Sequence, residues 1–258
     1  MKNEKSKISA LLITFNEINH IEKAIDNIIF ADEIVVIDSF STDGTLEFLK
    51  KKSGIKLITR EFTNFADQRN FAIKQARYQW ILFIDADERI PKALKKEILK
   101  VIENQNDISG FMIKRQHYFK NKPIKFSGYQ TDSTYRLFRN GDVTYDQKRT
   151  VHEVPIISGK NAFLKNKMLH YSFTSYDALK SKMEHYGKLK ALELFRKNKK
   201  ANPLHYTIKI IYKFLYNYII RMGFLDGKEG FTICYLNAYG VYYRYLELKQ
   251  LSNNSKKK

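Results

Sequence analysis

The stretch Trp80-Ile81-Leu82-Phe83-Ile84-Asp85-Ala86-Asp87-Glu88 decides the fold that we predict for this chain. Its first five residues are apolar without interruption, and three carboxylates follow within four positions. An apolar run of this length predicts a strand buried on both faces, at the centre of a parallel sheet. Ligands of open α/β sheets bind beyond the carboxyl ends of such strands, so we expect these acids at a ligand site.

The two aspartates of this stretch are candidates for a metal site. Asp85 and Asp87 have one residue between them, so both carboxylates can turn to the same side of a loop. Such oxygen ligands suit Mg²⁺ or Mn²⁺ shared with the phosphates of a substrate. Taken alone, the pattern Asp-x-Asp predicts an exposed turn equally well. The preceding strand and the segments upstream favour the metal site.

Strands and helices alternate upstream of this stretch. We predict strands over 8–15, 34–37, 55–59 and 80–84, separated by helices that include 18–29, 45–52 and 65–77. After Pro91 we expect a further amphipathic helix, to Glu103. Four strands separated by helices imply an α/β fold with a parallel, doubly wound sheet.

Polar side chains follow three of these strands, at Asn16, Glu17, Asp38, Asp85 and Asp87. Such residues can simply cap the following helix, which is the interpretation that we favour for Asp43. For Asp38 we expect a hydrogen bond with a base or ribose, as acids form in dinucleotide folds. The chain has no Gly-rich phosphate loop of the Rossmann or P-loop kind, so metal and basic side chains would have to neutralise phosphates.

The composition is that of a folded protein with an uneven charge. Of 258 residues, 43% are hydrophobic and 28% charged, while the net charge is +19. Residues 161–258 hold 19 Lys and Arg against six acids, together with 18 of the 36 aromatic residues. A basic, aromatic C-terminal third indicates an anionic partner, either nucleic acid or the surface of an acidic membrane.

The sequence also predicts a cytoplasmic protein. Its one cysteine, Cys234, excludes an internal disulfide and a Cys-based zinc site. The apolar run 8–15 is short for a signal peptide, and polar residues follow it without a cleavage site. The uncharged stretches 214–220 and 231–243 fall below the roughly 20 residues that span a bilayer.

Four segments together resemble the successive motifs of family 2 glycosyltransferases. They are Thr14–Glu17, Val36–Thr45, Gln68–Ala72 and Phe83–Glu88, in this order. Within that family the chain is most similar to the bacterial lipopolysaccharide core glycosyltransferases of the WaaE/KdtX type, typically β-1,4-glucosyltransferases. The resemblance implies a GT-A fold, which is a Rossmann-like, mostly parallel sheet flanked by helices. It also implies a nucleotide-sugar donor, a divalent metal and inversion at the anomeric carbon.

The resemblance assigns roles to individual residues. The uridine pocket would be lined by Phe15, Asn16, Glu17 and Asp38, with Arg69 near the diphosphate or base. Asp85 would contact the ribose or a metal-bound water, and Asp87 would bind Mg²⁺ or Mn²⁺ between the phosphates. Glu88 would either hydrogen-bond the donor sugar or pair with Arg89.

An inverting single displacement requires a carboxylate that deprotonates the acceptor hydroxyl. Our first candidate is Glu153, in a Val-His-Glu element that matches the resembled subgroup, and the second is Asp132. The neighbouring His152 would contact the metal or the substrate, or lie at the surface. For His170 we consider a metal ligand near the nucleotide and, as the favoured alternative, an ordinary core or surface histidine.

Two arginines flank the apolar pair Leu137-Phe138. We expect Arg136 and Arg139 to share one face of a strand. They would lie in solvent or, alternatively, grip an anionic acceptor.

We divide the chain into a GT-A catalytic domain over 1–170 and a helical, basic C-terminal region over 171–258. The nucleotide-sugar half of the catalytic domain would cover about 1–105 and the acceptor half about 106–170. Residues 208–222 mix Ile, Tyr and Phe with Lys and Arg. Such a helix can lie in the interface of an anionic membrane, or pack on the catalytic domain or a second subunit.

The predicted function is transfer of a hexose, glucose by the resemblance, from a UDP-sugar to a hydroxyl of a lipid-linked or lipopolysaccharide-core glycan. The enzyme would work at the inner face of the cytoplasmic membrane. One alternative is a nucleotidyltransferase that makes a sugar nucleotide, but the triphosphate loop expected after its first strand is missing. Another is a nucleic-acid-binding protein, whose phosphates the acidic strand ends would repel.

Overall fold

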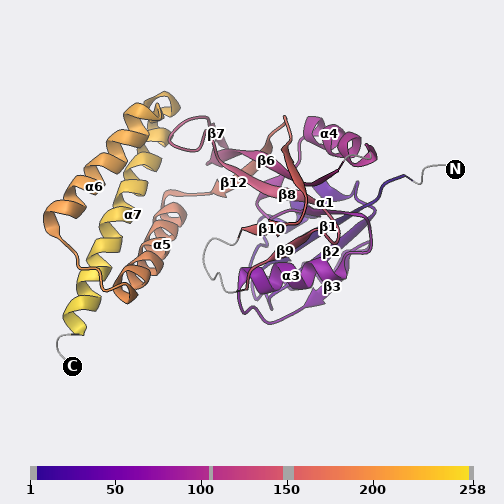
Figure 1. Ribbon diagram of the computed structural model, residues 1–258, viewed down its shortest axis with the longest axis horizontal. Coiled ribbons are helices and arrows are strands. Elements are labelled where there is room, and N and C mark those ends of the chain that lie inside the picture. The colour runs from indigo at the N-terminus through magenta and orange to yellow at the C-terminus, as the bar shows by residue number, and fades with distance from the viewer. Residues whose placement is uncertain (1–4, 105–106, 148–153, 256–258) are drawn as a thin grey trace. The chain divides into compact units, whose positions relative to one another are not determined.

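The structure is a computed structural model that describes residues 5–104, 107–147 and 154–255. The chain forms two compact units. The first comprises Met1–Arg115 and Asp132–His170, and the second comprises Gln116–Thr131 and Tyr171–Lys258. The first unit is an α/β structure, and three long helices dominate the second (Figure 1).

Four parallel strands form one half of the first unit. They are β1 (Ile8–Thr14), β2 (Glu33–Asp38), β3 (Lys56–Thr59) and β4 (Trp80–Phe83), in the order β3-β2-β1-β4. Helices α1 (Ile21–Ile28), α2 (Thr45–Lys51) and α3 (Phe65–Gln75) connect them. Thr14 lies opposite Asp38 in the β1–β2 pair, so the ends of these strands meet at one edge. The predicted parallel arrangement is confirmed for these four strands.

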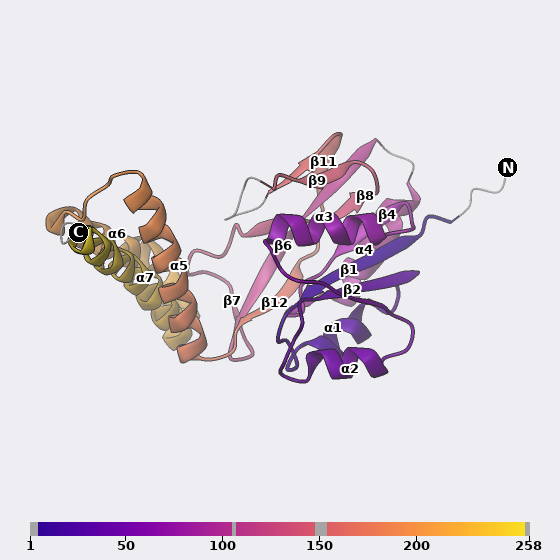
Figure 2. The same ribbon diagram turned by 90° about the horizontal axis from the view of Figure 1, so that it is seen from below.

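Strand β4 is buried on both faces, as its uninterrupted apolar run predicted. Trp80 and Leu82 belong to the core cluster that includes residues of α1 and of α4 (Lys92–Glu103). Ile81 and Phe83 belong to the opposite cluster, with residues of α3. Figure 2 shows α3 on one side of the parallel strands and α1 and α2 on the other. Alternate side chains of one strand therefore stabilise two cores, at about 1.5–3 kcal/mol for each fully buried side chain.

Beyond β4 the sheet becomes mixed. The added strands are β5 (Glu88–Arg89), β6 (Ile108–Phe119), β7 (Lys122–Ile124), β8 (Ser133–Arg139), β11 (Lys160–Phe163) and β12 (Met168–Phe173), while β9 (Val143–Tyr145) and β10 (Pro155–Ile157) form a separate pair. Strand β8 pairs antiparallel with β4. Strand β5 pairs antiparallel with β12, which places His170 opposite Glu88. This pairing brings the end of the first unit back to the segment Asp85–Glu88 after β4, called the acidic loop below.

The second unit consists mainly of α5 (Tyr176–Arg196), α6 (Pro203–Leu215) and α7 (Gly227–Asn254), which lie side by side in both views (Figures 1 and 2). A π-helical turn, η1 (Tyr216–Ile220), and a 3-10 turn, η2 (Gly223–Asp226), join α6 to α7. The side chains of Ser175 and Asn202 cap the N-termini of α5 and α6. Among the described residues, no helix has the length and apolar character required to cross a membrane.

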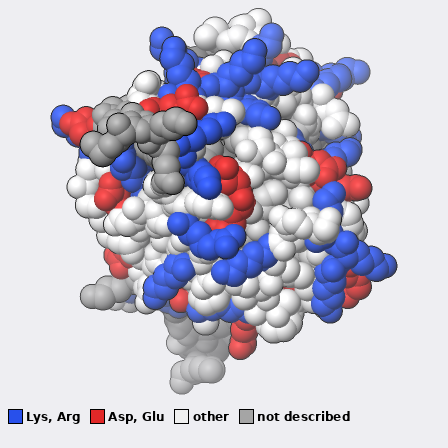
Figure 3. All heavy atoms as spheres, turned by 90° about the vertical axis from the view of Figure 1, so that its right-hand side faces the viewer, with Lys and Arg blue, Asp and Glu red and all other residues white. Residues whose placement is uncertain are grey.

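The positive charge of the chain is dispersed on the face that Figure 3 shows. Lysine and arginine side chains alternate there with acidic ones, and no single continuous basic patch covers the visible described residues. Exposed ion pairs such as Lys52–Asp26 illustrate this mixing. Exposed pairs of this kind contribute little to stability.

Asp226 fixes the turn between η2 and α7 to the loop after β7. Its carboxylate accepts hydrogen bonds from the backbone N–H groups of Lys125 and Phe126, both at 2.9 Å, and from the Ser127 hydroxyl at 2.8 Å. The absence of a side chain at Gly230 allows α7 to pack closely against η2, because a Cβ at Gly230 would lie 2.0 Å from the carbonyl oxygen of Gly223. One carboxylate thus satisfies three donors of a loop about 100 positions away in the chain.

We expect Asp226→Ala to lower the free energy of unfolding by about 2–3 kcal/mol, because it leaves these donors without their acceptor. Chemical denaturation of the variant and wild type measures the difference. Glu229→Ala is the matched control, since it removes a single ion pair with the exposed Lys122 and should cost under about 0.5 kcal/mol. Equal losses in the two variants would contradict a structural role for Asp226.

Candidate active site

A cavity of about 310 Å³ opens at the carboxyl edge of the parallel strands. Its lining includes Phe15 and Glu17 after β1, Gln68 and Arg69 on α3, and Asp85 and Asp87 after β4. Carboxyl ends of parallel strands meet at this edge, which is where ligands of α/β folds bind. The structure therefore gathers five of the predicted site residues, Phe15, Glu17, Arg69, Asp85 and Asp87, around one cavity.

Asn16 and Asp38 order the loops next to this cavity. Asp38 is buried, and its carboxylate accepts hydrogen bonds from the backbone N–H of Ser41 at 2.9 Å and from its hydroxyl at 2.6 Å. The same hydroxyl accepts from the backbone N–H of Asn16, whose side-chain oxygen accepts from Thr42. Asp38 is not among the described residues that line the cavity, so its contact with a base or ribose stays a prediction.

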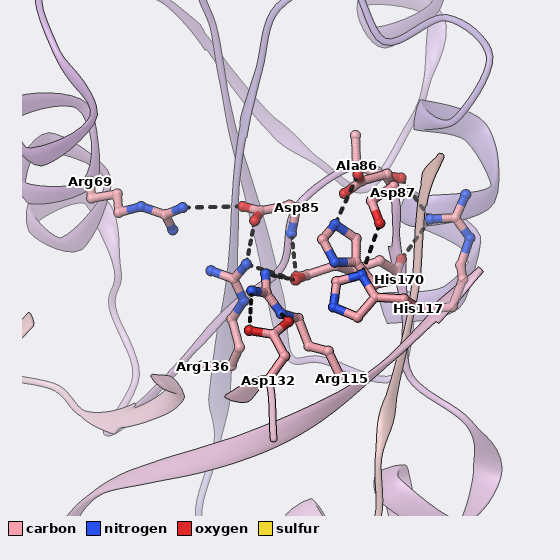
Figure 4. Close-up of polar contacts among 12 residues, drawn as sticks. Arg69, Asp85, Ala86, Asp87, Arg115, His117, Asp132, Arg136 and His170 are labelled. Atoms are coloured by element: carbon pink, nitrogen blue, oxygen red, sulfur yellow. Dashed lines mark hydrogen bonds and ion pairs between the residues drawn. The ribbon is translucent and has the colours of Figure 1, made fainter. Parts of the chain in front are cut away.

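Two arginines hold the first aspartate of the acidic loop (Figure 4). Arg136 on β8 donates to Oδ2 of Asp85, and Arg69 on α3 lies 3.3 Å from Oδ1. Burial raises the pKa of the Asp85 carboxyl, but the charges of Arg136 and Arg69 lower it more. The net pKa lies well below its ordinary value, so Asp85 is ionised with a guanidinium at each oxygen.

The structure corrects both expectations for Glu88. Its side chain is 0% exposed, so it does not reach the surface of the cavity to contact a sugar. Its carboxylate pairs with Arg136 at 2.7 Å, and it accepts the backbone N–H of Asp85 at 3.0 Å. Arg89 instead donates to carbonyl oxygens, including those of Ala86 and His20. Burial raises the pKa of Glu88, against the lowering effect of Arg136.

The expectation for Arg136 and Arg139 was also wrong. Residues three apart on a strand lie on opposite faces, because side chains alternate with a period of two. Arg136 is 4% exposed and joins Asp85 to Glu88, while Arg139 lies over the Trp80 ring at 4.9 Å. The charges of Asp85 and Glu88 raise the pKa of Arg136 in spite of its burial. A lone cation within the apolar strand 135–138 is the signal that could have identified this role.

Asp87 in the acidic loop contacts His170 on β12. The Nε2 atom of His170 lies 3.0 Å from Oδ2 of Asp87 (Figure 4). Sequence reasoning missed His20, whose pKa is lowered by burial and raised by the charge of Asp87, with a net lowering. Histidine and carboxylate are both metal-binding groups, so this arrangement is compatible with a divalent ion.

No group of three or more His, Cys, Asp or Glu side chains that could hold a metal is found in the described parts of the chain. Mg²⁺ and related ions are commonly bound through one or two carboxylates, with waters and substrate phosphates completing the shell. The donor set of Asp87 and His170 therefore fits such an ion. Asp85 is less suited to direct coordination, because both of its oxygens face arginine.

Of the two candidate bases, the structure describes Asp132 and not Glu153. Asp132 forms a two-pronged ion pair with Arg115, at 2.8 Å and 3.0 Å. Glu153 and His152 lie outside the described residues. Their roles stay predictions.

A model of the family described as glycosyl transferase family 2 matches residues 9–173. The chain belongs to glycosyl transferase family 2. An uncharacterized glycosyltransferase of Rickettsia conorii is 30% identical over 268 residues, which cover 99% of this chain and 94% of that protein. The lipopolysaccharide core biosynthesis glycosyltransferase LpsC of Rhizobium meliloti is 28% identical over 253 residues, covering 93% of this chain and 94% of the relative. The predicted family is confirmed.

The fold of this glycosyltransferase is similar to that of a solved enzyme. The mannosyltransferase PcManGT from Pyrobaculum calidifontis, in complex with GDP-Man and Mn²⁺, has a TM-score of 0.51 and 14% sequence identity. The match covers 97% of this chain and 76% of the mannosyltransferase. The predicted GT-A fold with a helical C-terminal region is thereby confirmed.

We expect Arg136→Met to lower the free energy of unfolding by about 3–5 kcal/mol at neutral pH, because Glu88 and Asp85 lose a buried counter-charge. The deficit relative to wild type should shrink as the pH falls toward 5. The reason is that the already raised pKa of Glu88 rises further, and its stability contribution is present at low pH and lost as pH rises through that pKa. Denaturation at several pH values measures this.

Two controls accompany this variant. Arg139→Met removes the cation over Trp80, which we expect to cost about 0.5–2 kcal/mol with no such pH dependence. Adding Glu88→Gln to Arg136→Met should restore part of the loss, because it removes a buried charge. A double variant less stable than Arg136→Met would reject the charge-pair explanation.

Proposed function

We propose that this family 2 glycosyltransferase moves a hexose from a UDP-sugar to a hydroxyl of a lipid-linked or lipopolysaccharide-core glycan. The observation that carries the proposal is the cavity at the carboxyl edge, which Arg69, Asp85 and Asp87 line together. The name of the Rhizobium relative supports a lipopolysaccharide-core acceptor. The resemblance supports glucose as the sugar and inversion at the anomeric carbon.

The residues around the cavity would divide the work of binding the donor. Phe15, Asn16 and Glu17 would surround the uridine, with Asp38 accepting a hydrogen bond from it. Arg69, held on α3 and already next to Asp85, would place positive charge near the diphosphate. Fixed charges of this kind stabilise the negative charge that develops on the leaving group.

Asp87 would hold Mg²⁺ or Mn²⁺, with His170 as a second ligand. Such an ion supplies Lewis-acid stabilisation of the departing diphosphate. Asp85 would contact the ribose or a metal-bound water and would not bind the ion directly, because Arg69 and Arg136 lie next to its two oxygens. Glu88 would position the loop through Arg136. Glu153 would deprotonate the acceptor hydroxyl, with Asp132 as the second candidate.

The acceptor would be met at the inner face of the cytoplasmic membrane. A lipid-linked glycan is anchored in the bilayer, so the enzyme would associate with it peripherally. The basic, aromatic C-terminal region supports this location through its charge. Membership of family 2 disfavours the nucleotidyltransferase alternative.

We expect purified enzyme to release UDP from a UDP-hexose when Mn²⁺ and a membrane extract are present. The rate of UDP release should fall at least about 100-fold with EDTA or in Asp87→Ala, because the leaving group loses its stabilising charge. A panel of UDP- and GDP-sugars identifies the donor, and GDP-sugars are included because PcManGT binds GDP-Man.

The matched control is Asp26→Ala, which removes an aspartate of the exposed pair with Lys52 and should leave the rate unchanged. Circular dichroism verifies that both variants are folded. Unchanged turnover in Asp87→Ala would reject the metal-binding role, and release of GDP alone would reject the uridine donor.

We expect Glu153→Gln to bind UDP-sugar normally and to lose about 100- to 10,000-fold in transfer rate, because the amide cannot accept the proton. Calorimetry with the donor and a transfer assay separate the two effects. Asp132→Asn is the comparison. If it loses transfer while Glu153→Gln retains it, the base is Asp132.

A further inference from the structure

The apolar stripe of α6 faces outward. Leu204, Ile208, Ile211 and Leu215 recur at helical spacing and are 72%, 57%, 54% and 43% exposed. No residue of α6 is buried. A surface helix normally turns such a stripe toward the core, and a contiguous exposed apolar surface marks an interaction site.

An apolar groove of about 490 Å³ lies between α6 and α7, next to this stripe. Its lining includes Ile210, Phe214 and Leu215 from α6, and Ala238, Tyr239 and Tyr242 from α7. The described residues that line it include no charged side chain. A groove with these walls suits a hydrocarbon chain rather than a polar ligand.

Positive charge without acidic charge accompanies the stripe. The segment 194–225 contains seven Lys and Arg residues and no Asp or Glu. Lys213 on α6 is half-buried, and its pKa is lowered by burial and by the charge of Arg244 on α7. Within the described ranges, neither of these two cations forms an ion pair with an acid. Both cations lie where α6 faces α7. Lys199 and Lys200, just before α6, are exposed. A basic segment without acids favours an anionic surface as its partner.

The dimensions favour a helix that lies along a bilayer. With 13 residues, α6 is about 20 Å long, less than the hydrocarbon thickness of about 30 Å. Helices with an apolar face and flanking lysines bind in the headgroup region, with the apolar face toward the acyl chains. Tyrosine is also typical of that region, and Tyr212 on α6 is 62% exposed.

We propose that the outward stripe of α6 and the adjoining groove bind an anionic lipid bilayer, with a hydrocarbon chain in the groove and the exposed lysines before α6, Lys199 and Lys200, at the headgroups. This inference rests on the proposed function, because a lipid-linked acceptor would lie at the surface of a bilayer. A second copy of the chain is disfavoured as the occupant. In a two-fold contact through α6, segments with cations and no acids would face each other and repel.

Co-sedimentation of the full chain with lipid vesicles tests the proposal. We expect binding to vesicles of phosphatidylcholine with phosphatidylglycerol, and at least tenfold weaker binding to phosphatidylcholine alone. Ile211→Ser combined with Leu215→Ser should lower the partition coefficient for mixed vesicles about tenfold or more. The matched control is Ile29→Ser, at a 72% exposed isoleucine of the first unit, which should bind as wild type does.

A charge variant tests the headgroup contact separately. Lys199→Gln with Lys200→Gln, at two exposed lysines just before α6, should weaken binding to the anionic vesicles about tenfold, most strongly at low salt, and leave binding to phosphatidylcholine unchanged. Lys92→Gln with Lys96→Gln on α4 is the matched control. Equal effects of the two pairs would overturn the assignment of the lysines.

The rate of donor turnover without vesicles separates this inference from the proposed function. We expect this rate to be unchanged in the apolar and charge variants. Vesicle binding by a chain that turns over no donor would reject the proposed function and support the surface. Donor turnover without vesicle binding would reject the surface. A dimer that becomes a monomer in Ile211→Ser with Leu215→Ser, again without vesicle binding, would assign the stripe to a second copy.

Discussion

The site depends on the burial of negative charge next to Arg136. Asp85 and Glu88 stand within one turn of the chain, and Glu88 has no access to solvent. Two carboxylates so close repel each other, and removing them from water is costly. The guanidinium of Arg136 contacts both, and Arg69 and Arg115 add further positive charge. This network fixes the loop, and the loop in turn presents Asp87 to the cavity.

The parallel half of the fold was predictable because its signals are local. The run Trp80 to Ile84 serves two cores, and each earlier strand ends at a polar residue that begins a loop, such as Asp38. Asp43 accepts the backbone N–H of Thr45, the first residue of α2, although the N-cap residue of that helix is Gly44. The mixed half was harder, because antiparallel register joins residues far apart in the sequence. The pairing of β5 with β12 has no local signal.

The site was predictable as a set of positions and less so as a set of contacts. Motifs placed Phe15, Glu17, Arg69, Asp85 and Asp87, which line one cavity. Which cation meets which acid depends on tertiary structure, so the partner of Glu88 was wrong and the role of Arg136 was missed. In α6 the pattern predicted an amphipathic helix, but which way its apolar stripe faces is a tertiary property.

Strand β12 supplies the histidine that meets Asp87, although it lies more than 80 positions further along the chain. During synthesis the N-terminal strands can assemble while the ribosome is still translating the middle of the messenger RNA. Asp87 in the acidic loop nevertheless cannot contact His170 until β12 has been synthesised. A nascent or truncated chain that stops before that strand would have the four parallel strands without the contact between Asp87 and His170.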